Sequence, residues 1–111
     1  MNKIIIAPSI LTASFANLES TIKELEEAGA DYLHLDIMDG SFVPQITFGS
    51  KIVSDIKKIT SLPLDVHLMI VSPEKHIDDF AKAGADIISV HYEGNIHLHK
   101  LIMQIKSHNV K

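Results

Sequence analysis

The chain has 111 residues, 46% of them hydrophobic, and 14 acidic and 10 basic residues give it a formal net charge of −4. This composition is typical of one compact, soluble domain and excludes a disordered or fibrous segment. The charges of both signs are interspersed and form no basic block, so we expect no binding to nucleic acid or to an anionic membrane. Cysteine is absent, which excludes disulfides, thiolate zinc sites and cysteine nucleophiles.

The N-terminal stretch MNKIIIAPSIL is interrupted by Pro8 after a short apolar run. It is too short for a signal peptide or a membrane span. We therefore expect a cytoplasmic protein.

Four short runs rich in β-branched and aliphatic residues alternate with segments of helical period. The runs predict strands that are buried on both faces, and each intervening segment has one apolar stripe. Gly29 and Gly84 stand where two of the helices should end, and Ser72-Pro73 is typical of a helix start. The predicted strands are 3–11, 31–39, 63–71 and 85–93, and the helical stripes begin near Phe15, Ile52, Ile77 and Leu98.

This order predicts a parallel sheet built from β-α-β units with right-handed crossovers. The tetrapeptide Ala-Gly-Ala-Asp occurs at 28–31 and again at 83–86, each time between a helix and the next strand. The repeat fits either common helix-to-strand turn chemistry or duplication of a half-barrel. We expect residues 1–111 to form one domain without a separate second domain.

Side chains alternate along a strand, so His34, Asp36 and Met38 share one face of their strand and the aliphatic residues between them share the other. In the same way His67 and Met69 lie opposite Val66 and Leu68. Two neighbouring strands are thus predicted to direct a histidine and a methionine inward at matching heights. The carboxyl ends of parallel strands are where catalytic groups collect.

Two imidazoles and a carboxylate, from His34, Asp36 and His67, form most of a site for a divalent cation such as zinc, manganese or iron. A hydrogen-bonded cluster without metal is the alternative. For His91 we favour a hydrogen-bonded core residue, and for Asp39 a structural role in the turn with Gly40. Ser9 is either a capping serine or a hydroxyl directed at a ligand.

Five motifs carry a family resemblance: APSIL at 7–11, HLDIMDGSFVP at 34–44, TFG at 47–49, DVHLM at 65–69 and VHYE at 90–93. Together they resemble the N-terminal half of ribulose-phosphate 3-epimerase. Two positions differ from the usual family pattern, Gln45 in place of Asn and Ser50 in place of Pro.

The resemblance implies an α/β fold of the parallel (β/α)8 TIM-type barrel class, of which this chain covers about the first four βα units. It implies a metal-dependent epimerisation at C3 that converts D-ribulose 5-phosphate to D-xylulose 5-phosphate in the pentose phosphate pathway, by two-base proton transfer through an enediolate. The second acid and the phosphate-binding loops would then lie in a later part of the protein. We also expect a homo-oligomer that binds a small ketose phosphate.

Residue roles follow from the same resemblance. His34, Asp36 and His67 would bind one divalent metal ion, with zinc favoured over iron, manganese or cobalt. Asp36 would also be the catalytic base, and Ser9, His67, Met38 and Met69 would contact the substrate.

Three alternatives remain open. The hexulose phosphate enzyme allulose-6-phosphate 3-epimerase is a close relative in chemistry. Metal-assisted hydrolysis would use the same His and Asp residues to activate water. The chain on its own could also be an inactive half-barrel that only self-associates.

Overall fold

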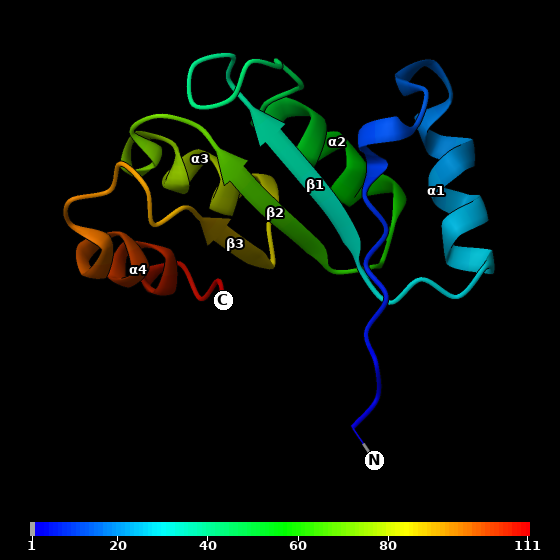
Figure 1. The fold of residues 1–111 in the computed structure, drawn as a ribbon. Coiled ribbons are helices and arrows are strands. Elements are labelled where there is room, and N and C mark those ends of the chain that lie inside the picture. The colour runs from blue at the N-terminus through cyan, green and yellow to red at the C-terminus, as the bar shows by residue number, and fades with distance from the viewer. Residues whose placement is uncertain (1) are drawn as a thin grey trace.

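A computed structural model describes residues 2–111 as a three-stranded parallel sheet with four α-helices (Figure 1). The strand order is β1-β2-β3, and every pair is parallel. The parallel α/β prediction is therefore confirmed. The strands are β1 (Leu33–Met38), β2 (Leu64–Met69) and β3 (Ile87–Val90); the helices are α1 (Leu18–Glu27), α2 (Ser50–Ile59), α3 (Ile77–Ala83) and α4 (Leu98–Ser107), with short 3-10 helices at Ile10–Thr12, Phe15–Asn17 and Pro73–Lys75.

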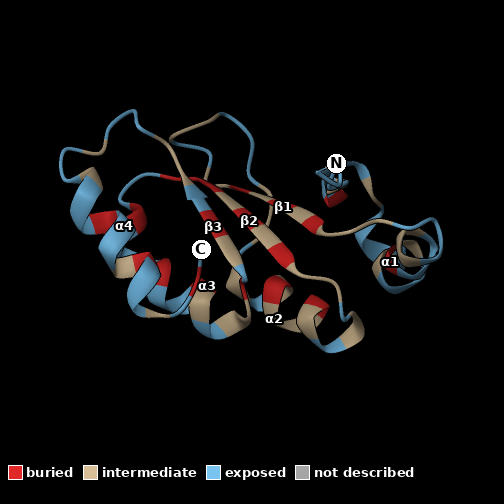
Figure 2. Ribbon diagram, turned by 90° about the horizontal axis from the view of Figure 1, so that it is seen from below, coloured by how far each residue is buried: buried red, intermediate tan, exposed pale blue. Residues whose placement is uncertain are grey.

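The hydrophobic core lies between the sheet and the helices that cover one of its faces (Figure 2). Leu33 and Leu35 of β1 are completely buried, as are Val66 of β2 and Ile56 of α2. Burial of each such side chain contributes about 1.5–3 kcal/mol. On the opposite face the alternate residues stay partly exposed as far as Met38 in β1 and His67 in β2. That second face carries the polar side chains that the alternation predicts.

The predicted first strand, 3–11, is only partly correct. Its central part is extended beside β1, where Ile6 O accepts from Asp31 N and Pro8 O accepts from His34 N at 2.9 Å each. A single parallel bridge joins Ser9 to His34. Pro8 has no N–H to extend the pairing, and Ser9 caps the 3-10 helix that begins at Ile10. The chain therefore leaves the sheet two residues before the predicted end.

The repeated Ala-Gly-Ala-Asp sequence has the same structural role at both sites. Asp31 N donates to Ile6 O while Asp31 Oδ2 accepts from Ile6 N, both at 2.9 Å. Asp86 forms the same reciprocal pair with Leu64, at 3.0 and 2.8 Å. Each aspartate thus attaches the start of its own strand to the preceding extended segment. The repeated sequence therefore serves the same helix-to-strand turn twice, which fits either origin considered for it.

Gly84 ends α3 in the left-handed conformation, with φ of 109°. A Cβ there would lie 2.7 Å from Lys57 Cγ of α2, so the turn also needs a glycine for space. The following residue pairs back, because Ala85 N donates to Phe80 O. This close approach sets the path of the chain from α3 into β3.

The outer edge of β3 is paired near its start with Lys111, four residues after the end of α4. Ile88 N donates to Lys111 O at 2.9 Å and Lys111 N donates to Asp86 O at 3.2 Å. This is the bonding of a further parallel strand. Among residues 2–111, no helix combines the length and the apolar character needed to cross a bilayer.

Candidate metal centre

The polar residues of β1 and β2 lie opposite one another in the parallel register. His34 is paired with Asp65, Asp36 with His67 and Met38 with Met69. The prediction of matching heights is therefore correct for the methionines and wrong for the histidines, since His34 lies two register pairs closer to the strand start than His67. The offset places Asp36 beside both imidazoles.

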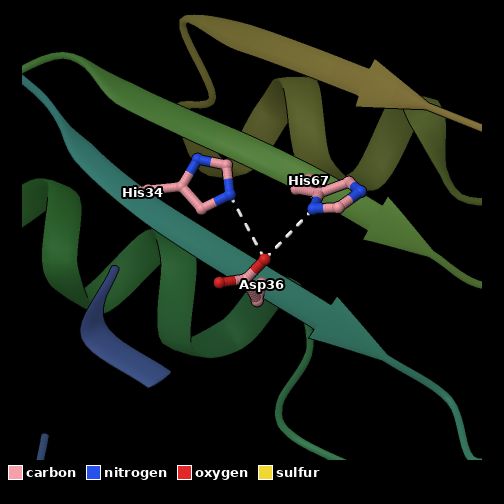
Figure 3. A group of neighbouring side chains, drawn as sticks. All are labelled: His34, Asp36 and His67. Atoms are coloured by element: carbon pink, nitrogen blue, oxygen red, sulfur yellow. Dashed lines mark hydrogen bonds and ion pairs between the residues drawn. The ribbon is translucent and has the colours of Figure 1, made fainter. Parts of the chain in front are cut away.

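Asp36 Oδ1 is the point on which the two histidines converge (Figure 3). His34 Nε2 lies 3.2 Å from this oxygen and His67 Nδ1 lies 3.1 Å from it. One ligand atom from each of the three residues lies within 4.8 Å of the others. Two imidazoles and one carboxylate at this spacing could hold a divalent cation.

The donor set fits a cation because His34 lies between two carboxylates. Asp65 Oδ2 is 2.8 Å from His34 Nδ1, on the side of the ring away from Asp36. A carboxylate only accepts, so the proton of a neutral His34 belongs on Nδ1 and leaves a lone pair on Nε2. That lone pair faces Asp36 Oδ1, and two acceptors at such a distance require a proton or a cation between them.

Asp36 stays ionised although it is partly covered. Burial opposes its ionisation, but the hydrogen bond from Ser9 and the contacts with His67 and His34 outweigh this effect and hold the pKa of Asp36 below its usual value. Ionised carboxylate is the form that binds a cation or accepts a proton.

Ser9 has the capping role that was one of the two considered for it. Its Oγ accepts from Leu11 N at 3.2 Å, which caps the 3-10 helix. The same hydroxyl donates to Asp36 Oδ2 at 2.5 Å. Ser9 is thus a capping residue that also touches the carboxylate of the cluster, whereas its contact with a substrate stays a prediction.

His91 is hydrogen-bonded, as predicted, but it is not a core residue. Its Nε2 lies 2.7 Å from His67 Nε2, and about a third of its side chain is exposed. The ring of Phe42, from the loop after β1, packs against it with centroids 4.9 Å apart. His91 therefore lies behind His67 as seen from Asp36.

The loop between β1 and α2 is held against the sheet by Asp39. Asp39 Oδ1 accepts from Ser41 N and Phe42 N at 2.9 Å, and Oδ2 accepts from Val71 N at 2.8 Å. These bonds lower the pKa of Asp39. The structural reading of Asp39 is confirmed, and its reach to Val71 also joins the ends of β1 and β2.

Two polar residues near the cluster were not predicted to have a role. Thr47 Oγ1 donates to Asp36 O at 2.7 Å and accepts from Met38 N at 3.0 Å, so the loop is also anchored beside the cluster. Asp65 contacts His34. The alternation that placed His67 and Met69 on the inner face also places Asp65 there, and this signal would have found it. No comparable pattern marks Thr47.

Met38 and Met69 follow the cluster at the strand ends. Met38 is partly exposed and Met69 is buried, with 8% of its surface accessible. They form a register pair two residues beyond that of Asp36 and His67, on the same face of the sheet. Their contact with a substrate stays a prediction.

Comparison with known proteins supports the resemblance in the sequence motifs. The ribulose-phosphate 3 epimerase family model matches residues 5–111. The chain is 59% identical over 105 residues to ribulose-phosphate 3-epimerase from Synechocystis and 57% identical over 106 residues to the protein of that name from Bacillus subtilis. It is 56% identical over 110 residues to the chloroplastic ribulose-5-phosphate-3-epimerase of Arabidopsis thaliana.

These matches cover 93%, 96% and 97% of this chain but 46%, 49% and 39% of the Synechocystis, Bacillus and Arabidopsis proteins. The chain thus spans less than half the length of these relatives. The match nevertheless includes every residue of the candidate metal centre. The chain belongs to the ribulose-phosphate 3-epimerase family, whose fold is the TIM-type barrel.

Proposed function

We propose that residues 1–111 are the N-terminal half of a (β/α)8 barrel that interconverts D-ribulose 5-phosphate and D-xylulose 5-phosphate by inverting C3. The observation that carries the proposal is the arrangement around Asp36. An ionised carboxylate is held by a serine hydroxyl and faces two imidazoles on adjacent parallel strands, in a chain of the epimerase family.

Inversion at C3 needs a base, because the hydrogen on this carbon is only weakly acidic even beside the ketone. Asp36 is the base in this proposal. Its Oδ2 is bound by Ser9 and its Oδ1 faces the imidazoles, so the carboxylate is fixed in one orientation before substrate binds. Asp36 takes the C3 proton on one face of the carbon, and the electron pair moves onto the ketone oxygen to give an enediolate.

A single divalent ion would be held by His34 Nε2, His67 Nδ1 and the Asp36 carboxylate. Zinc suits two imidazoles and a carboxylate, and iron, manganese and cobalt are the alternatives. When bound, the ion supplies positive charge to the oxygen on which the enediolate charge develops. Ser9 and His67 would contact the substrate, and Met38 and Met69 would line the reacting carbons with apolar surface.

The reaction also needs an acid on the other face of C3, since one group alone would return the proton to the face it left. Among residues 2–111, the group that could hold the metal contains one carboxylate, that of Asp36. We assign the second acid and the phosphate-binding loops to the other half of the barrel. In TIM barrels phosphate commonly binds after strands seven and eight.

The test uses the complete protein with D-ribulose 5-phosphate in deuterated water. We expect formation of D-xylulose 5-phosphate, measured with a coupled assay, and entry of deuterium at C3, measured by NMR. Release of inorganic phosphate without C3 exchange would contradict epimerisation and support hydrolysis. A larger kcat/KM for D-allulose 6-phosphate than for the pentose would instead make the protein a hexulose phosphate epimerase.

A further inference from the structure

Each histidine of the cluster has a second contact on the ring nitrogen that points away from Asp36. For His34 this contact is Asp65 Oδ2, at 2.8 Å from Nδ1. For His67 it is His91 Nε2, at 2.7 Å from Nε2. Asp65 lies on β2, the neighbour of β1, and His91 directly follows β3, the neighbour of β2. The sheet itself therefore supplies a second layer of contacts behind the imidazoles.

We propose that Asp65 and His91 are positioning residues that hold His34 with Nε2, and His67 with Nδ1, directed at the metal ion. The inference rests on the metal-dependent function proposed above and adds two residues to it. Neither residue touches the proposed ion or the reacting carbon. Both act through the histidine in front of them.

Asp65 restricts His34 to one tautomer. Its carboxylate can only accept, so His34 Nδ1 must carry the proton and Nε2 must present the lone pair. The two side chains start from directly opposed backbone positions, and both are about three-quarters covered. Carboxylates that accept from a ligating histidine raise its basicity and fix its ring, and their loss commonly weakens metal binding about 10–100-fold.

His91 acts differently because an imidazole can both donate and accept. Without metal, His67 Nδ1 can donate to Asp36 Oδ1 and His67 Nε2 can accept from His91 Nε2. When His67 Nδ1 binds a cation, its proton must be on Nε2, and His91 Nε2 must then accept. The short contact thus survives metal binding with its direction reversed. His91 Nδ1, 3.4 Å from Glu93 Oε2, is then the protonated nitrogen.

The experiment measures metal affinity in the complete protein, by competition with a chromophoric chelator for zinc, and the visible absorption of the cobalt(II) form. Asp65→Ala removes the acceptor, and Asp65→Asn keeps a neutral one of the same shape. His91→Phe keeps the ring contact with Phe42 but cannot accept, whereas His91→Gln can. Asp78→Ala is the matched control. Asp78 also accepts from a histidine, His108 Nε2 at 2.9 Å, but this exposed pair is not part of the metal-binding group.

We expect Asp65→Ala to weaken zinc binding about 10–100-fold and His91→Phe to weaken it about 10-fold, each with an altered cobalt spectrum. Asp65→Asn and His91→Gln should recover part of the loss, and Asp78→Ala should bind as the unchanged protein does. Partial recovery by the conservative variants separates orientation from a general loss of structure. If Asp65→Ala fails to fold, the zinc affinity and cobalt spectrum of the nearly isosteric Asp65→Asn test the role of Asp65. Thermal unfolding checks that each variant is folded.

Two results would overturn the inference, and they differ in what else they affect. If the unchanged protein binds metal and the folded Asp65 and His91 variants bind it equally well with the same cobalt spectrum, the positioning roles are wrong and the proposed function stands. If the unchanged protein binds no metal at all, the inference fails together with the metal-dependent part of the proposed function.

Discussion

Ser9 Oγ donates to Asp36 Oδ2 at 2.5 Å, so a residue that precedes the first helix orients the carboxylate at the centre of the cluster. The contact spans 27 positions of sequence. It exists because the extended segment 6–9 pairs with the edge of β1 and then turns away at the 3-10 helix. The irregular end of the first predicted strand therefore has a direct consequence for the site.

The first prediction concerns Ser9→Ala in the complete protein. Loss of a hydrogen bond to a charged group is worth about 1.5–3 kcal/mol, so we expect kcat to fall at least about 10-fold. Loss of the cap should reduce the free energy of unfolding by about 1 kcal/mol. Both are measured on the same preparation, by the coupled assay and by urea unfolding.

Ser14→Ala is the control for Ser9→Ala, because Ser14 also precedes a 3-10 helix but makes no side-chain cap hydrogen bond. It should change neither quantity. Ser9→Thr keeps the hydroxyl and should retain most of the activity. A fully active Ser9→Ala enzyme would show that the contact with Asp36 is dispensable.

The second prediction concerns Asp36→Asn, which removes the basic charge and keeps the shape of the side chain. Turnover should fall by at least about 100-fold, the usual effect of losing a general base. The melting temperature should change little, since Asp36 lies on the open face of the sheet and not in the hydrophobic core. If the variant exchanged the C3 hydrogen with solvent at the normal rate, Asp36 would not be the base.

The third prediction is that the complete protein binds one divalent ion per chain through His34, Asp36 and His67. Elemental analysis should find close to one equivalent, and dialysis against a chelator should remove both the metal and the activity. Added zinc, iron, manganese or cobalt should restore turnover to different extents and so identify the preferred ion. Full activity after verified removal of metal would contradict the proposal.

Much of this site could be predicted from the sequence because strand alternation alone decides which side chains share a face. His34 and Asp36 were placed correctly in this way, and so was His67. Register could not be predicted, since it depends on how β1 and β2 pair in three dimensions. The position of His34 opposite Asp65, and not opposite His67, therefore emerged only from the structure.

Long-range side-chain contacts likewise could not be predicted from the sequence. The bond from Ser9 to Asp36 and the bond from Val71 N to Asp39 depend on the path of a loop or an extended segment, and no local pattern encodes that path. The sequence did contain the signals that end the first extended segment earlier than the predicted strand. Pro8 cannot donate, and a serine before a turn is a good cap.

The fourth prediction is a pH dependence of stability that originates at Asp39. Backbone hydrogen bonds from Val71, Ser41 and Phe42 lower the pKa of Asp39 in the folded protein. A lowered folded pKa means that this residue stabilises the fold above its unfolded pKa of about 3.9, and that the contribution is lost as the pH falls through the folded value. The free energy of unfolding should therefore differ between wild type and Asp39→Asn at pH 7, and the difference should shrink below about pH 4.

Urea unfolding of both proteins at several pH values measures this difference. Asp55→Asn is the comparison, because the pKa of Asp55 is also lowered, but by the exposed Lys51 and Lys58 on its own helix. Added salt should reduce the effect of Asp55→Asn and leave that of Asp39→Asn nearly unchanged. A stability difference for Asp39→Asn that is the same at acid and neutral pH would show that its backbone bonds are not the cause.

The last prediction concerns residues 1–111 expressed alone. Three paired strands and one extended segment cannot close a barrel, so the backbone edges and the inner face of the sheet meet water. Large apolar side chains are exposed near both edges, among them Ile4 at 80%, Tyr92 at 80% and Ile96 at 92%. We expect this piece to self-associate, either as a dimer that pairs two half-barrels or as larger aggregates, and to show no appreciable epimerase turnover.

Even a dimer would duplicate Asp36 and supply neither the opposing acid nor the phosphate loops. Light scattering and the coupled assay on the purified piece measure both properties, with the complete protein as the active control. A stable monomer with nearly full activity would show that the chain is not half of a barrel.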